Sequence, residues 1–157
     1  MTRVAILLSL LLLGADIQGI AAQDGPCTYD QCALRLKPAA FGPRLVRGLN
    51  ETSVAHFVFL APRLDSLMQR SDSAMRYYSL FRARNNRGFW LSLAGLGLFG
   101  AGYLIYAVDR DLEGPAVAVS IAGAATWIVG VITQGRSRDP FSKAIWWYNR
   151  SLSHSSP

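Results

Sequence analysis

The residues best suited to chemistry in this chain of 157 residues are its only two cysteines, Cys27 and Cys32. A close cysteine pair in an exported protein usually forms a structural disulfide. A redox-active dithiol and a metal site are the alternatives. The four residues between the cysteines differ from the two-residue gap of thioredoxin-like motifs, and no second Cys or His pair completes a zinc-binding set. We therefore expect a disulfide that closes a tight loop.

The sequence contains no recognisable catalytic arrangement. His56 stands without a partner at ligand or catalytic spacing. There is no Ser-His-Asp set and no glycine-rich phosphate loop after a strand. We expect no catalytic residue, no metal and no cofactor, and hence a protein that is not an enzyme.

The longest apolar stretches of the mature chain are two segments, 88–108 and 114–134. Neither contains an Asp, Glu, Lys, Arg or His residue, and a short polar turn separates them. About 20 apolar residues suffice for a helix to cross a bilayer core of roughly 30 Å. The pair therefore predicts an antiparallel transmembrane hairpin. Because no acidic or basic side chain lies within the spans, a proton or ion pathway is not expected.

Small residues recur along both predicted spans, as Gly97 and Ala101 on the first and Ala118 and Ala122, followed by Thr126 and Gly130, on the second. Small residues let helix backbones approach closely in lipid. Two interpretations follow. These residues either form the contact within the hairpin or present a face to another membrane subunit.

Residues 1–22 are typical of a secretory signal peptide, with Arg3 before an apolar stretch and small residues at Ala21 and Ala22. The charges favour the opposite topology. Segment 23–87 has ten basic and five acidic residues, and segment 135–157 has four basic and one acidic, so the positive-inside rule would keep both in the cytoplasm. A segment as long as 23–87 can be translocated despite its charge. We give precedence to the signal and the cysteine pair, and expect an inner-membrane protein with periplasmic mature termini.

Outside the spans the pattern predicts four segments. Residues 23–61 are expected to be largely irregular, with a short strand at 33–37 that could pair with 43–47. The apolar run 54–60 is either a further strand or a segment that lies on the lipid surface. Apolar residues at three- and four-residue spacing predict an amphipathic juxtamembrane helix at 62–87, with a possible restart at Ser71. An interfacial aromatic helix is expected at 140–152, followed by a tail at 153–157.

The last two helices leave the hairpin on the same side, so we expect them to pack together as an aromatic and basic platform for partners. The residues of this predicted platform are Trp146, Trp147, Tyr148, Arg82, Arg84 and Arg87. Lipid phosphates and another membrane protein both suit such a surface. Nucleic acid is not expected despite a pI near 9.8, because the basic residues are dispersed and lie beside a membrane.

The predicted signal and hairpin combine with three short motifs, CTYDQCALR at 27–35, SDSA at 71–74 and AIWWYNR at 144–150. The combination resembles small uncharacterised bacterial envelope proteins. This resemblance implies a location in the envelope and implies no activity.

The expected fold is mainly α: a two-span transmembrane helical hairpin, an amphipathic juxtamembrane helix and a small irregular segment that carries the cysteine pair. The expected function is that of a non-enzymatic integral membrane protein that packs with membrane or periplasmic partners, or with itself. Two alternatives remain open. The chain could be an accessory subunit of a larger bioenergetic or transport complex, or a thiol-redox membrane protein that uses Cys27 and Cys32.

The cysteine pair gives a direct prediction. Membrane-extracted protein analysed by mass spectrometry without reduction should be lighter by two hydrogens than the reduced chain. Because the closed loop is small, the bond should contribute about 2 kcal/mol at most to the free energy of unfolding. Two free thiols in unreduced protein would contradict the structural disulfide and favour the redox alternative.

Overall fold

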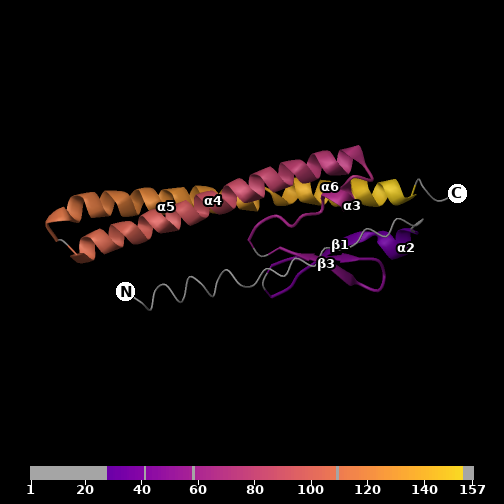
Figure 1. The fold of residues 1–157 in the computed structure, drawn as a ribbon, viewed down its shortest axis with the longest axis horizontal. Coiled ribbons are helices and arrows are strands. Elements are labelled where there is room, and N and C mark those ends of the chain that lie inside the picture. The colour runs from indigo at the N-terminus through magenta and orange to yellow at the C-terminus, as the bar shows by residue number, and fades with distance from the viewer. Residues whose placement is uncertain (1–27, 41, 58, 109, 154–157) are drawn as a thin grey trace.

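The computed structural model describes residues 28–40, 42–57, 59–108 and 110–153. The chain is mainly helical and carries one small sheet (Figure 1). In chain order the elements are α2 (Tyr29–Cys32), β1 (Leu34–Lys37), β2 (Arg44–Arg47), β3 (Thr52–His56), α3 (Asp65–Met68), α4 (Asp72–Val108), the 3-10 turn η1 (Arg110–Leu112), α5 (Glu113–Gly135) and α6 (Arg138–Ser153). The predicted signal peptide at 1–22, Cys27 and residues 154–157 of the predicted tail lie outside the described residues.

The long helix α4 is paired along its length with two consecutive antiparallel helices, α5 and α6 (Figure 1). Helix α4 has 37 residues and is therefore about 55 Å long. Helices α5 and α6 follow each other along α4 in the opposite direction, with a two-residue turn at 136–137 between them (Figure 1). The predicted boundary between a juxtamembrane helix and a first span at residue 88 therefore lies inside a single continuous helix.

The contact between the helices follows a seven-residue repeat. Its buried residues are Ala74, Phe81, Gly88, Gly95 and Gly102 on α4, and Ala116, Gly123, Gly130, Ser137 and Ala144 along α5, the turn and α6. A seven-residue period keeps one seam of each helix facing its partner and is the period of left-handed coiled coils. We call these ten residues the seam.

Along the apolar half of the hairpin the seam consists of glycine and alanine because the backbones touch. A Cβ added at Gly95 would lie 2.3 Å from the Trp127 nitrogen and 2.7 Å from the Gly123 oxygen. A Cβ at Gly123 would lie 2.3 Å from the Phe99 nitrogen. Only glycine allows this approach, which is the mode of helix packing that lipid favours.

The small residues that the sequence suggested for the hairpin contact lie elsewhere. Gly97, Ala101, Ala118 and Ala122 are all exposed, and a Cβ at Gly97 would meet nothing within 4 Å. The interpretation that they close the hairpin is therefore wrong. Of the small residues that recur at four-residue spacing, Gly130 does lie in the seam, because the helices pack with a period of seven that passes through it.

The two halves of the hairpin differ in what covers them. From residue 89 to the tip, large apolar side chains of α4 and α5 point outward. Helix α4 and the helical run from Glu113 to Ser153 are both long and apolar enough to cross a membrane, and only 11% and 17% of the most apolar stretch of each is buried. The core helix of a soluble protein would be mostly buried. We call this half, 89–108 and 113–134, the arms.

The other half of the hairpin carries the sheet and forms a head. The strands pair antiparallel in the order β1-β2-β3, with Leu34 opposite Arg47 and a bulge between Leu45 and Val46. The predicted pairing of a strand at 33–37 with 43–47 is confirmed. The strand that the sequence offered as one alternative for 54–60 is found two residues earlier, as β3 at 52–56, and 29–32 forms a helical turn where an irregular chain was expected.

The helix predicted at 62–87 begins later than expected. Residues 65–68 form the separate short helix α3, and α4 begins at Asp72. Ser71 caps α4, since its carbonyl accepts the first helical hydrogen bond from the Met75 nitrogen at 2.9 Å and its hydroxyl faces the Ala74 nitrogen at 3.4 Å. The predicted restart at Ser71 is thus the true start of the long helix.

The seam gives a matched pair of variants. Gly95→Ala places a methyl group against the opposing backbone, and we expect it to lower the free energy of unfolding in detergent by about 1–3 kcal/mol. Gly97→Ala, two residues away on the open side, should leave stability unchanged or raise it by up to about 1 kcal/mol through helix propensity. Thermal unfolding followed by circular dichroism measures both. Equal effects of the two substitutions would contradict the seam.

Candidate functional site

The head is built around aromatic side chains that join the sheet, α4 and α6. Phe57, which follows β3, packs edge-on against Phe81 of α4 and Phe141 of α6, with ring centroids 5.9 and 4.8 Å away. Phe81 and Phe141 are 4.5 Å apart. Buried aromatic pairs add about 0.5–1.5 kcal/mol to the burial of their area. This cluster fixes the sheet to the helix pair.

Asn149 of α6 ties the sheet edge to the helices. Its Oδ1 accepts a hydrogen bond of 2.8 Å from the Leu34 nitrogen, and its Nδ2 donates one of 2.9 Å to the Leu34 oxygen. The amide thus pairs with the free edge of β1 as a neighbouring strand would. This contact joins residues 115 positions apart in the sequence.

Two buried tyrosines lie on either side of this core. The Tyr78 hydroxyl donates to the Pro62 carbonyl and accepts from the Leu64 nitrogen at 3.0 Å, so it fixes the start of α3. The Tyr148 hydroxyl is buried and has no hydrogen-bond partner within the described part of the chain. Burial raises the pKa of both phenols, and the guanidinium groups of Arg47 and Arg70 partly oppose the rise at Tyr148.

The structure separates the six residues of the predicted platform. Tyr148 lies in the core, and Arg82 donates to both carboxylate oxygens of Asp65 at 3.1 and 3.2 Å. Trp147 is half-buried, whereas Trp146, Arg84 and Arg87 are exposed. The predicted packing of the 140–152 helix beside the 62–87 helix is confirmed by the contact of α6 with the first part of α4.

An aromatic and basic cluster lies on the outer side of α6. The Arg150 guanidinium stands over the rings of Trp146 and Trp147, 5.1 and 5.5 Å from their centroids, and the two rings meet edge to face. Lys143 lies 5.7 Å from the centre of the Tyr77 ring on α4. Such cation–π contacts hold the side chains in fixed positions while leaving them accessible.

Cys32 is fully buried under the sheet, and the Arg47 Nε lies 3.1 Å from its sulfur. Cys27 lies outside the described residues, so the disulfide stays a prediction. A buried sulfur in this position suits a structural role, because reactive cysteines are partly exposed.

A second set of polar contacts marks the level where the head meets the arms. Asn85 of α4 and Gln134 of α5 both donate to the Phe59 oxygen, at 3.1 and 3.2 Å. The next residue of α4, Asn86, accepts a hydrogen bond of 3.1 Å from the Ala61 nitrogen. Three side-chain amides therefore hold the segment between β3 and α3 against both helices.

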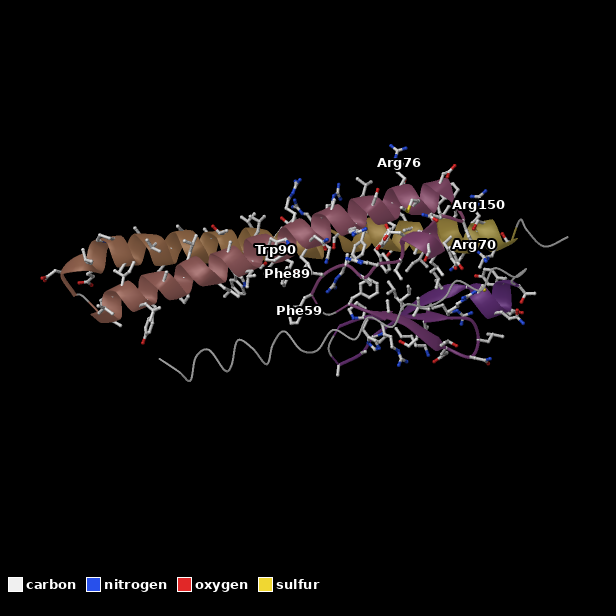
Figure 2. The ribbon with its side chains drawn as sticks, in the orientation of Figure 1. Phe59, Arg70, Arg76, Phe89, Trp90 and Arg150 are labelled. Carbon is white, nitrogen blue, oxygen red and sulfur yellow. The ribbon has the colours of Figure 1, made fainter. Side chains whose placement is uncertain are left out.

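Exposed aromatic side chains gather at this same level. Phe59 and Trp90 each have 59% of their surface exposed. The Phe59 and Phe89 rings lie 6.0 Å apart, and Phe89 meets Trp90 at 5.4 Å. Figure 2 shows these three residues at one level along the molecule, with Arg70, Arg76 and Arg150 toward the opposite end of the head. No local pattern in the sequence indicates that Phe59 lies beside Phe89 and Trp90, because Phe59 is far from both along the chain.

The described residues contain no cluster of metal-ligating side chains. No group of three or more His, Cys, Asp or Glu side chains within this part of the chain could hold a metal ion. His56 is exposed on β3, and its Nε2 lies 3.3 Å from the Ser53 hydroxyl. The candidate site is a surface at the level where the head meets the arms. It is formed by the aromatic residues Phe59, Phe89 and Trp90 and by the exposed Arg84 and Arg87 of α4.

Comparisons of the chain with protein-family models, with curated proteins and with solved structures found no match.

The contact between Asn149 and Leu34 can be tested with a matched control. Asn149→Ala leaves a buried backbone N–H and C=O without partners, and we expect a loss of about 2–4 kcal/mol in the free energy of unfolding. Asn50→Ala, in the exposed turn after β2, should change it by less than about 0.5 kcal/mol. Chemical denaturation in detergent measures both. A loss at Asn149 no larger than that at Asn50 would contradict the role of the amide.

Proposed function

We propose that the chain is a non-enzymatic integral membrane protein of the bacterial envelope, whose arms span the inner membrane and whose head lies on the periplasmic surface. One observation carries this proposal. We call α4 one rod of the hairpin, and α5 followed by α6 the other. Near residues 85–89 and 134 both rods change from exposed apolar arms to a head that is covered by the sheet and held by polar contacts.

The dimensions of the arms support this arrangement. The 20 residues from 89 to 108 give a helix of about 30 Å, which equals the hydrocarbon thickness of a bilayer. Acidic residues follow at the tip, with Asp111 and Glu113 exposed. Exposed apolar surface of this extent is stable in lipid and would cause aggregation in water.

The aromatic residues at the base of the arms support the same placement. Aromatic rings are favoured at the headgroup level, where the boundary cluster of Phe59, Phe89 and Trp90 would lie. Helix α6 continues from α5 along α4, so it would lead away from the bilayer (Figure 1). In this arrangement the boundary cluster, and not the 140–152 helix, would lie at the membrane interface.

We propose further that the head holds its exposed residues for a membrane or periplasmic partner, or for a second copy of the chain. The fixed stack of Trp146, Trp147 and Arg150 suits this role, because aromatic and arginine side chains are enriched where proteins bind.

An accessory subunit of a larger complex is the second candidate. The exposed small residues Gly97, Ala101, Ala118 and Ala122 favour it, because they remain outside the hairpin contact and would allow close approach of a further helix.

Topology provides the test of the proposal. Single cysteines introduced as Ser79→Cys in the head and Glu113→Cys at the tip are both exposed. With a membrane-impermeant maleimide, Ser79→Cys should react once the outer membrane alone is opened, whereas Glu113→Cys should react only after the inner membrane is permeabilised. The reverse pattern would place the head in the cytoplasm. Reaction at both sites, together with release of the protein by alkaline carbonate, would show that the arms do not span the membrane.

A further inference from the structure

Exposed arginines gather at the base of the arms, at the level of the boundary cluster. Gly88 contacts Gln134 across the seam, since a Cβ at Gly88 would lie 2.7 Å from the Gln134 nitrogen. Arg84 and Arg87 precede this level on α4, and Arg136 and Arg138 follow it on the other rod. At 1.5 Å per helical residue, all four lie within roughly 6 Å of one plane along the helix axes. We call them the girdle.

The charge at this level is strongly unbalanced. All four girdle arginines are exposed. Of the acidic residues nearby, Asp65 is engaged by Arg82, and Asp139 directly follows Arg138. No acidic residue is adjacent in the sequence to Arg84, Arg87 or Arg136. On the arm side of the plane the exposed surface is aromatic and aliphatic, with Trp90 three residues after Arg87.

We propose that the girdle binds the phosphate headgroups of anionic phospholipids, and that the protein selects such lipids from the bilayer around it. The inference rests on the proposed function, because it requires the arms to be in the membrane. Guanidinium groups bind phosphate oxygens through paired N–H donors, and each basic residue at a membrane surface is worth about 1 kcal/mol. A cationic layer directly beside an apolar one matches a lipid that has an anionic headgroup above an acyl chain.

The girdle arginines differ from other exposed arginines of the chain in their position at the base of the arms. Arg76 lies 12 residues from Gly88 along α4, which is about 18 Å from the plane and beyond the Debye length of roughly 8 Å at physiological salt. Arg35 and Arg63 are also exposed but belong to β1 and to the segment before α3. These three arginines provide a control set for the substitution of three of the four girdle arginines.

The test compares two triple variants of the full chain, reconstituted in vesicles of phosphatidylcholine and phosphatidylglycerol. The girdle variant is Arg84→Gln, Arg87→Gln and Arg136→Gln, and the control is Arg35→Gln, Arg63→Gln and Arg76→Gln. Arg138 is retained because it begins α6. Quenching of tryptophan fluorescence by either lipid brominated near its glycerol end reports the lipid composition beside Trp90 and the arms.

We expect the wild-type protein and the control variant to prefer phosphatidylglycerol over phosphatidylcholine by about fivefold or more, which corresponds to about 1 kcal/mol. The girdle variant should show no preference. The wild-type preference should weaken as sodium chloride is raised. Inorganic phosphate at the same ionic strength should act no more strongly than chloride.

Three results would overturn the proposal: no preference in the wild-type protein, an equal loss in both triple variants, or selective competition by inorganic phosphate, which would indicate a site for a free anion. Failure of the proposed function is recognised separately. In that case alkaline carbonate would release the wild-type protein from the vesicles, whatever their lipid composition.

Discussion

The rest of the structure depends on the close approach of the two helical rods along the seam. In the arms this approach is possible only because Gly95, Gly102, Gly123 and Gly130 leave the opposing backbones in contact. In lipid, where no hydrophobic force drives helices to associate, this packing would hold the arms together. Because α4 runs without a break through both the head and the arms, the packing along the seam also fixes the orientation of the head relative to the arms.

The seam continues into the head with different residues and a different stabilising force. Ala74, Phe81, Ser137 and Ala144 occupy it there, and Phe81 joins Phe57 and Phe141 in an aromatic core. Burial of apolar area from water stabilises this half. The sheet completes the core from one side and is held at its edge by Asn149. In the proposed function one helical pair is adapted to two solvents, and the amide contacts of Asn85 and Gln134 lie at the level where the solvent would change.

The sequence predicted the elements whose signal is local. The apolar segments at 88–108 and 114–134, the paired strands and the restart at Ser71 could all be inferred from residue type and spacing. The seam was missed because four-residue spacings of small residues are conspicuous, whereas the buried positions repeat every seven. Tyr148 was predicted to be a surface residue because a single helix cannot reveal that a sheet from the other end of the chain covers it. The contacts of Asn149 with Leu34 and of Gln134 with Phe59 are long-range and have no sequence signature.

The central claim is that α4 passes from membrane to water within one continuous helix, and spin labelling tests it most directly. Nitroxide labels at Leu80 and Gly97 are both on exposed positions of this helix. In vesicles, collision with oxygen should exceed collision with a water-soluble nickel complex at 97, and the nickel complex should dominate at 80. Strong collision with the nickel complex at both positions would place the whole helix in water and contradict the account.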